Sequence, residues 1–418
     1  MGKREYIKKK LTGDKEREHI SYEDVPLDEI KDSEPLPANA TKKFFKVFII
    51  IALSVIVVMV LMNMDKLTVE NISHWISFDL LGQSEGDGYP ASFSGADVDT
   101  GNFDLMDGVP VYCSDTSIAV LNSNAGKYQE VNHAFANPIL STNSYYSMVY
   151  NAGATGYTVI DRDSVVKSGL TEKKIFSADV CPKGIYCILS EDDDYLAKLT
   201  VYRKDDLEMY KYSFADFYVN RVSINSEGTR AVVSGLSAKN GSLLSVLYVL
   251  DFSQGNYMQR YEFDEVYIYD LKYLNNGNAV AVGDKSAYYI DINGGTKKNI
   301  EYHSKSLTTY TLDRKNGMLL SLSSTPDGRE CEVVMINDSG EMSVGIQTKR
   351  QVVSVDYRDE RIAVLFDREA AVYDMKGGKV ASMELKGDAR KIRFADANSV
   401  YILGKSSLYN VSPEKTKK

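Results

Sequence analysis

The chain has 418 residues, which is too long for one small domain at ~150 residues per domain, although one large all-β array also accommodates this length. Its hydrophobic content of 44% and its charged content of 26% exclude a wholly disordered, collagen-like or multi-span membrane protein. The formal net charge of −9 argues against a nucleic acid as partner, because binding to phosphates requires a basic face.

The first 43 residues carry many charges and three of the nine prolines but few apolar side chains. Such a segment cannot bury enough surface to offset the entropy of ordering, so we expect residues 1–43 to be a disordered tail. Its basic beginning is suited to anionic lipid, and residues 22–36 are suited to a short docking peptide. A solvated spacer is the simpler interpretation.

Residues 44–64 read FFKVFIIIALSVIVVMVLMNM, with Lys46 as the only charge. As a helix at ~1.5 Å per residue this run covers ~30 Å, the thickness of a bilayer core, and it predicts a transmembrane helix. A cleaved signal peptide is disfavoured, because the apolar run is long and no small-residue cleavage site follows it. Lys42 and Lys43 precede the run and Asp65 follows it, which predicts a signal anchor with a cytoplasmic N-terminus and an extracytoplasmic body.

Residues 65–88 are predicted to form a short juxtamembrane amphipathic helix and a linker. Apolar residues recur at helical spacing from Val69 to Leu80, and Trp75 suits the headgroup level of a membrane. Glycines in residues 82–88 then indicate a flexible joint.

One unit recurs eight times after residue 89. Each unit contains an apolar strand that ends at a polar turn, and the first residues of these strands lie 38 to 48 positions apart, with a mean near 41. This spacing is typical of a four-stranded propeller blade. The eight strands are residues 118–121, 157–161, 199–202, 247–251, 287–291, 332–336, 370–374 and 408–411.

A second apolar run precedes each of these strands, and a second turn precedes that run. Pairs such as Asp107-Gly108 and Asn276-Gly277 supply the positive φ that a tight hairpin turn needs. The order of strands and turns is that of one propeller blade. The three-stranded cores are residues 103–121, 138–161, 176–202, 220–251, 268–291, 308–336, 352–374 and 390–410.

The last unit lacks an outer strand, because few residues remain after it. Residues 89–95 (YPASFSG) form an isolated segment before the first core, and pairing with the last unit would close the ring and cover two sheet edges. We therefore predict an all-β propeller of about eight four-stranded blades in residues 89–412, with seven blades as the alternative, and a tail at 413–418. No linker interrupts residues 100–410, as separate sandwich domains would require.

Residues 221–235 (RVSINSEGTRAVVSG) and 270–283 (DLKYLNNGNAVAVG) resemble the inner strands of WD40-like and quinoprotein-like propellers. The Gly-His and Trp-Asp signatures of true WD40 repeats are absent. The layout of tail, signal anchor and tyrosine-rich propeller also resembles an uncharacterised family of single-pass bacterial envelope proteins with a domain of unknown function. This resemblance implies an architecture and brings no known activity.

The propeller segment offers little recognisable chemistry. It contains no tryptophan, on which the cofactor of quinoprotein dehydrogenases stacks. His133 and His303 have no partner at ligand spacing, and the acidic run at residues 191–194 (EDDD) is expected to be a solvated turn rather than a calcium site. We assign no catalytic, cofactor-binding or metal-binding residue.

Cysteines and turn aspartates permit narrower hypotheses. Cys181 and Cys187 flank a predicted turn, so they either face each other in a disulfide or serve as two small core residues, and a Cys113–Cys331 bond is less favoured. Aspartates that end the recurring strands are expected to cap turns with their side chains. These are Asp161, Asp251, Asp291 and Asp374.

The sequence therefore favours a membrane-anchored, extracytoplasmic β-propeller that acts as a non-catalytic scaffold in the cell envelope. Its expected partners are membrane lipid, through the single span, and a protein or cell-wall ligand on one propeller face. The alternative is an envelope carbohydrate-binding protein, or a lyase or glycosidase with a site over the propeller channel. Two carboxylates ~5 to 9 Å apart in a cleft over the channel would favour the enzyme.

Overall fold

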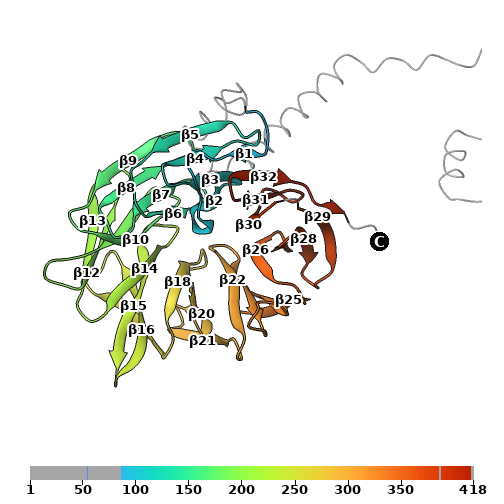
Figure 1. The fold of residues 1–418 in the computed structure, drawn as a ribbon. Coiled ribbons are helices and arrows are strands. Elements are labelled where there is room, and N and C mark those ends of the chain that lie inside the picture. Colours follow the sequence, from blue (N-terminus) through green and yellow to red (C-terminus); the bar gives the residue numbers. More distant parts are fainter. Residues whose placement is uncertain (1–53, 55–85, 386, 416–418) are drawn as a thin grey trace, which may run out of the picture. The chain divides into compact units, whose positions relative to one another are not determined.

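The computed structural model describes Ser54 and residues 86–415 without residue 386. In this range eight antiparallel sheets are arranged around a central channel (Figure 1). Each sheet is a propeller blade, and we name its four main strands A, B, C and D from the channel outward. The predicted all-β propeller is confirmed, with eight blades rather than the alternative of seven.

The blades follow one another along the chain. Blade 1 contains β2 (Phe103–Met106), β3 (Val109–Cys113), β4 (Ser117–Leu121) and β5 (Lys127–Asn132) after a short 3-10 helix, η3 (Thr100–Asn102). Blade 2 contains β6 (Pro138–Thr142), β7 (Ser147–Asn151), β8 (Gly156–Ile160) and β9 (Val165–Leu170). Blade 3 contains β10 (Ile175–Val180), β11 (Tyr186–Ser190), β12 (Ala197–Tyr202) and β13 (Glu208–Phe214). Blade 4 contains β14 (Tyr218–Ile224), β15 (Arg230–Lys239), β16 (Ser242–Asp251) and β17 (Tyr257–Asp264).

The second half repeats this order. Blade 5 contains β18 (Ile268–Tyr273), β19 (Ala279–Gly283), β20 (Ser286–Asp291) and β21 (Thr296–Glu301). Blade 6 contains β22 (Ser306–Asp313), β23 (Gly317–Ser323), β24 (Cys331–Ile336) and β25 (Met342–Thr348). Blade 7 contains β26 (Val352–Arg358), β27 (Arg361–Phe366), β28 (Glu369–Asp374) and β29 (Lys379–Glu384). Blade 8 contains β30 (Ala389–Phe394), β31 (Val400–Gly404), β32 (Ser407–Val411) and β1 (Ala91–Ser92). The recurring strands of the sequence are the C strands.

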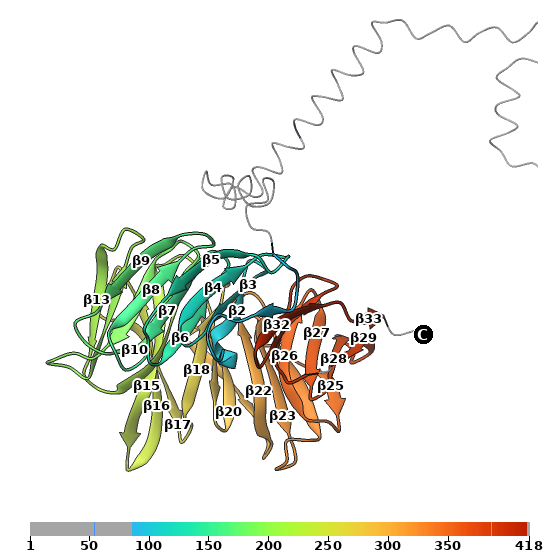
Figure 2. The ribbon, with the colours of Figure 1, turned by 45° about the horizontal axis from the view of Figure 1, so that its top comes forward.

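The ring closes through strand β1, as the isolated segment 89–95 predicts. Ala91 pairs with Leu408 and Ser92 with Ser407, so the first described strand supplies the D strand of the last blade (Figure 1). Blade 8 thereby lies beside blade 1, as β32 and β2 show in Figure 2. A short strand β33 (Glu414–Lys415) adds a fifth strand to blade 7 by pairing with β29. The propeller thus continues past residue 412, because part of the predicted tail 413–418 covers an otherwise open sheet edge.

The turns between A and B strands use the predicted backbone conformation. Asp107 and Gly108 have φ values of 50° and 81°, and Gly317 has a φ of 97°. At Gly317 an added Cβ would lie 2.2 Å from the carbonyl oxygen of Ile336, so both conformation and space require glycine there. Tight turns of this kind hold the A and B strands in register.

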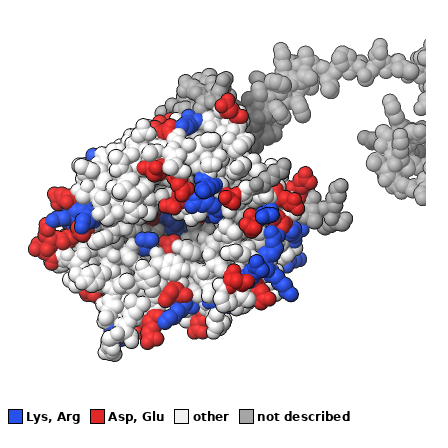
Figure 3. Space-filling model, in the orientation of Figure 1, with Lys and Arg blue, Asp and Glu red and all other residues white. Residues whose placement is uncertain are grey.

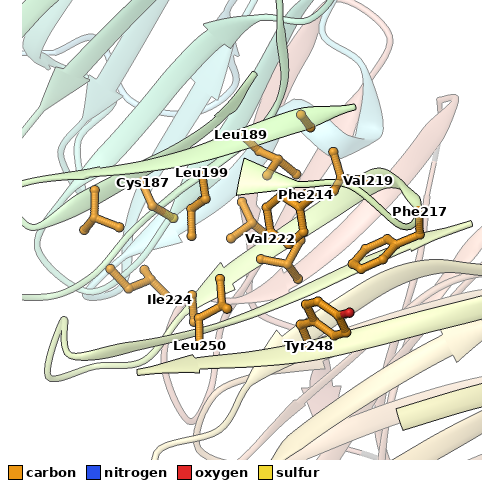
Figure 4. Close-up of a cluster of buried hydrophobic side chains, with 14 of the residues drawn as sticks. Cys187, Leu189, Leu199, Phe214, Phe217, Val219, Val222, Ile224, Tyr248 and Leu250 are labelled. Atoms are coloured by element: carbon orange, nitrogen blue, oxygen red, sulfur yellow. The ribbon is translucent and has the colours of Figure 1, made fainter. Parts of the chain in front are cut away.

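The hydrophobic core consists of eight clusters, one between each pair of neighbouring blades in the described propeller. In the cluster between blades 3 and 4, Phe214 and Phe217 from the end of blade 3 pack against Tyr248 of β16 (Figure 4). Cys181 and Cys187 lie in this same cluster, and both are buried free thiols. They are therefore two small core residues and not a disulfide.

No helix within the described residues is long and apolar enough to cross a bilayer. The predicted tail, the predicted span at 44–64 apart from Ser54, and most of the predicted segment 65–88 lie outside the described residues. The transmembrane helix and the location of the propeller stay predictions.

Candidate functional site

Eight polar residues occupy matching positions on the A strands and form one layer across the channel. Each pairs with the corresponding residue of its B strand, close to the turn between the two strands. We call this layer the central tier. In blade order it contains Asp104, Ser141, Asp179, Ser223, Lys272, Thr311, Asp356 and Arg393.

Asp179 joins three neighbouring blades on one side of the tier. Its carboxylate accepts hydrogen bonds from Ser141 Oγ at 2.6 Å, from Ser223 Oγ at 3.0 Å and from the backbone N–H of Ile224 at 2.9 Å. Burial by itself raises the pKa of Asp179, but the charges of Arg314 and Lys272 and these hydrogen bonds outweigh it, so the pKa lies below its ordinary value.

Arg314 reaches Asp179 from the opposite part of the ring. It follows β22 in blade 6, and its guanidinium lies 2.7 Å from Asp179 Oδ2 in blade 3 and also donates to the carbonyl oxygen of Ile224 in blade 4. Its Nε is buried and has no hydrogen-bond partner among the described residues. Arg314 therefore links blades 3, 4 and 6 across the channel, and its Nε–H remains available as a hydrogen-bond donor.

Arg393 has the corresponding role where the ring closes. Its guanidinium contacts Asp104 of blade 1 and Asp356 of blade 7, each at 3.1 Å, and Thr311 Oγ1 of blade 6 at 3.0 Å. Asp356 also accepts the backbone N–H of Phe394 at 2.7 Å. Burial raises the pKa of Asp356 more than the charge of Arg393 lowers it, whereas at Asp104 the charges of Arg393 and Lys391 outweigh burial and the pKa is lowered.

Lys391 lies two positions before Arg393 on β30. Its Nζ donates to the carbonyl oxygens of Thr100 at 2.8 Å and Phe103 at 2.6 Å, which ties blade 8 to the start of blade 1. Burial, followed by repulsion from Arg393, lowers the pKa of Lys391 to about 7.

A cavity of about 1120 Å³ extends along the channel past the central tier. Seven acidic and seven basic residues line it, together with Tyr269, Tyr310 and Tyr357. Figure 3 shows Lys and Arg beside Asp and Glu at the hollow in the middle of the ring. The carboxylates of Asp104 and Asp356 both pair with Arg393, so in this structure they link blades 1 and 7 to blade 8.

The histidines and the acidic run of the sequence analysis lie away from the channel. His133 Nε2 is 3.2 Å from Cys113 Sγ, but burial raises the pKa of Cys113 to about 12 and lowers that of His133, so the pair is neutral and lacks a reactive thiolate. His303 is exposed beside Glu301. In the run 191–194, two carboxylates pair with lysines, and the described residues contain no group of three or more His, Cys, Asp or Glu placed to hold a metal ion.

The predicted turn caps are confirmed. The side chain of each aspartate at the end of a C strand accepts backbone N–H groups of the following turn. The contacts are Asp161 to Ser164 at 2.7 Å, Asp251 to Ser253 at 3.0 Å, Asp291 to Gly294 at 2.8 Å and Asp374 to Gly378 at 2.8 Å.

A second feature, which the sequence analysis did not identify, is the long hairpin of blade 4. β15 and β16 have ten residues each, whereas β19 and β20 of blade 5 have five and six. Residues 236–244 thus extend beyond blade 5, and we call them the arm (Figure 1). One face of the arm, together with the first residue of β14, carries cross-strand neighbours that we call the arm face: Tyr218 of β14 and Leu236, Ala238 and Leu243 of the arm.

Comparisons with known proteins support the fold and the family. Residues 90–412 match the family described as "Family of unknown function (DUF5711)", and the chain belongs to this family. No curated protein matches. Among solved structures, BamB from Moraxella catarrhalis has a TM-score of 0.47 at 10% identity and covers 78% of this chain and 100% of its own.

Two further structures cover similar shares. The C-terminal WD40 domain of Sif2 has a TM-score of 0.53 at 12% identity, covering 78% of this chain and 98% of that domain. A eukaryotic initiation factor has a TM-score of 0.51 at 9% identity, covering 79% and 91%. Identities this low show a shared propeller fold and nothing about ligands.

Proposed function

We propose that this member of the DUF5711 family is a non-catalytic protein-binding platform, held in a membrane by residues 44–64 with its propeller on the extracytoplasmic side. The observation that carries the binding role is the uncovered arm face. Exposed apolar side chains that are contiguous and held on a rigid element are typical of interaction sites.

The arm face is apolar by register. Tyr218 pairs with Leu236 and Ala238 pairs with Leu243, and paired residues on adjacent strands point to the same side of a sheet. Tyr218 is 68% exposed and Leu243 is 40% exposed. Ser245, two residues from Leu243, donates to the carbonyl oxygen of Val266 at 2.7 Å, so this side of the sheet faces blade 5.

Blade 5 leaves the arm face open because its own hairpin turns back early. β19 ends at Gly283 and β20 begins at Ser286, so no strand of blade 5 reaches the level of Ala238. The pairing of β16 with β17 ends at Leu244, and the carbonyl oxygen of Leu243 still accepts the backbone N–H of Glu265 at 2.9 Å. A partner therefore meets the exposed apolar side chains of the arm face, with Tyr218 and Leu243 the most accessible.

The first described residues of the propeller lie on the side away from the arm. Gly88 donates its N–H to the carbonyl oxygen of Asn124, which lies in the turn between the C and D strands of blade 1. The arm belongs to a turn between B and C strands, at the opposite end of the strands. Gly88, near the start of the described propeller, therefore lies at the opposite end of the strands from the arm face.

Site-specific photocrosslinking in intact membranes tests the binding role. A photoreactive residue at position 218 or 243 is expected to give a discrete adduct with a protein partner, and one at position 342, where Met342 is 57% exposed on blade 6, is expected to give none. Leu236→Ser should weaken the adduct at 218 because it makes the arm face polar. Equal adducts at all three positions, or none at 218 and 243, would refute the docking surface.

Cysteine labelling tests the membrane arrangement. All four native cysteines are buried, so the chain gives little background with a maleimide that does not cross membranes. Ser339→Cys, at an exposed turn of blade 6, should be labelled on intact cells, and Ser33→Cys in the predicted tail only after permeabilisation. The reverse pattern, or labelling of neither variant in a chain that fractionates away from membranes, would contradict the proposed anchor.

A further inference from the structure

The charges around the channel cavity cancel one another. Seven acidic and seven basic side chains line it, and the central ones are paired across blades, as Arg393 is with Asp104 and Asp356. A charged ligand would have to break such a pair or enter unpaired, and either event costs free energy in a partly desolvated site. The cavity is therefore matched to a ligand without net charge.

Tyrosines lead from the surface into this cavity on the side of the turns between B and C strands. Tyr267 is 38% exposed, Tyr269 lines the cavity, and Tyr310 lies deeper on β22. Their ring centroids are 6.1 Å apart from Tyr267 to Tyr269 and 5.9 Å apart from Tyr269 to Tyr310. Such rings offer flat apolar contact area with a hydrogen-bonding group at the edge.

Fixed polar groups continue beyond the tyrosines. The hydroxyl group of Tyr310 donates a hydrogen bond of 3.0 Å to the carboxylate of Asp270. Burial raises the pKa of Tyr310, and it raises the pKa of Tyr269 to about 12, so both hydroxyls stay protonated at neutral pH. Arg314 Nε is a buried donor with no partner among the described residues. Lining residues from several blades add hydroxyl and amide groups, such as those of Thr142 in blade 2 and Asn316 in blade 6.

We infer that the channel binds a segment of a neutral oligosaccharide. Sugar rings have apolar C–H faces, which can pack on the rings of Tyr267, Tyr269 and Tyr310. Their hydroxyl groups both donate and accept hydrogen bonds, so they can bind to acidic and basic side chains of the lining alike. The volume of about 1120 Å³ slightly exceeds the roughly 300–1,000 Å³ of ligand pockets, which suits more than one sugar ring. This site is independent of the arm face and of the proposed protein partner.

Isothermal titration of the full chain in detergent micelles tests the inference. The probes are neutral hexasaccharides of glucose, N-acetylglucosamine and mannose, with a galacturonate hexasaccharide as the acidic comparator and a proline-rich decapeptide as the competing ligand class. At least one neutral hexasaccharide should bind with a Kd below about 1 mM, corresponding to roughly −4 kcal/mol. The acidic probe and the peptide should bind at least tenfold more weakly.

Variants then locate the site. Tyr269→Ala should weaken binding of the neutral probe at least tenfold, and Tyr409→Ala, which removes a 39% exposed tyrosine on β32 outside the cavity lining, should leave it unchanged. Leu243→Ser on the arm should not alter sugar binding, which separates this result from failure of the proposed docking surface. The inference is overturned if no neutral probe binds, if the acidic probe or the peptide binds best, or if Tyr269→Ala behaves like Tyr409→Ala.

Discussion

Asp179 provides the most direct test of the central tier. Asp179→Ala removes a carboxylate that is 2% exposed and leaves the guanidinium of Arg314 without its partner in a position that is itself only 11% exposed. Removing one member of a buried ion pair costs ~3–5 kcal/mol, because the other charge stays buried and uncompensated. Ser141, Ser223 and the N–H of Ile224 also lose their acceptor. We therefore expect the free energy of unfolding to fall by at least about 4 kcal/mol.

Equilibrium urea unfolding of the full chain at pH 7 measures this loss. Asp179→Asn keeps the shape of the side chain and an acceptor, so it should cost less, about 1–3 kcal/mol. In the double variant Asp179→Ala/Arg314→Met no buried charge is left unpaired, and its stability should exceed that of Asp179→Ala alone. Because the pKa of Asp179 is lowered by folding, the native advantage exists above the unfolded pKa of ~3.9 and disappears as the pH falls through the folded pKa.

Three results would refute the reasoning. The tier would not hold blades together if Asp179→Ala lost less than about 1 kcal/mol, the size of an ordinary exposed contact. The pair with Arg314 would be unimportant if the double variant were no more stable than Asp179→Ala. The charge would be irrelevant if the difference between Asp179→Ala and the native chain did not shrink at acidic pH.

Three further predictions concern the turns, the seam and the thiols. Gly317→Ala should destabilise the propeller by about 3 kcal/mol or more, and Gly153→Ala, which also has a positive φ but open space around it, by only about 1 kcal/mol, as judged by urea midpoints. Burial lowers the pKa of Lys391 to about 7, so the unfolded chain binds more protons than the native chain above that pH. The free energy of unfolding should therefore rise from pH 7 to 9 by at most ~1.4 kcal/mol per pH unit. Lys391→Met should remove this rise, and an unchanged slope would contradict the lowered pKa of Lys391. Thiol titration should find none of the four cysteines reactive in the native chain and all four after unfolding without reductant, whereas two after unfolding would indicate a disulfide.

The repeat made the architecture predictable, because each blade carries its own pattern. Apolar alternation and turn chemistry are local properties, so the C strands, the turns with positive φ and the capping aspartates such as Asp251 could be assigned without knowledge of the ring. Closure by residues 89–95 was also predictable, because the last unit lacks an outer strand and the chain has one unassigned strand before the first unit. Pairing of the two completes the last blade. Strand β33 could not be foreseen, because two paired residues leave no periodic signal.

The central tier and the arm required information that the repeat contains only indirectly. Arg314 and Asp179 are separated by 135 residues, and nothing near either one marks the partner. Superimposing the eight units on their turns would have shown a polar residue at the same place on every A strand. The arm had a signal as well, since the spacing of 48 residues before the C strand of blade 4 is the longest of the series. That extra length is the additional part of β15 and β16.

The composition of the tier follows from the problem of closing a ring of similar sheets. Apolar faces between blades are nearly interchangeable, because each is a mixture of the same aliphatic and aromatic residues, and they do not dictate how many blades the ring contains. Buried ion pairs add little net stability but penalise any arrangement that leaves a charge without its partner. Arg393 pairs with Asp104 only if blade 8 meets blade 1, and Arg314 pairs with Asp179 only if two blades lie between them in the described ring. A ring of seven or nine blades would leave at least one of these charges without its partner, so the central tier favours eight blades. The same paired charges are the reason that we expect the channel to bind a neutral ligand.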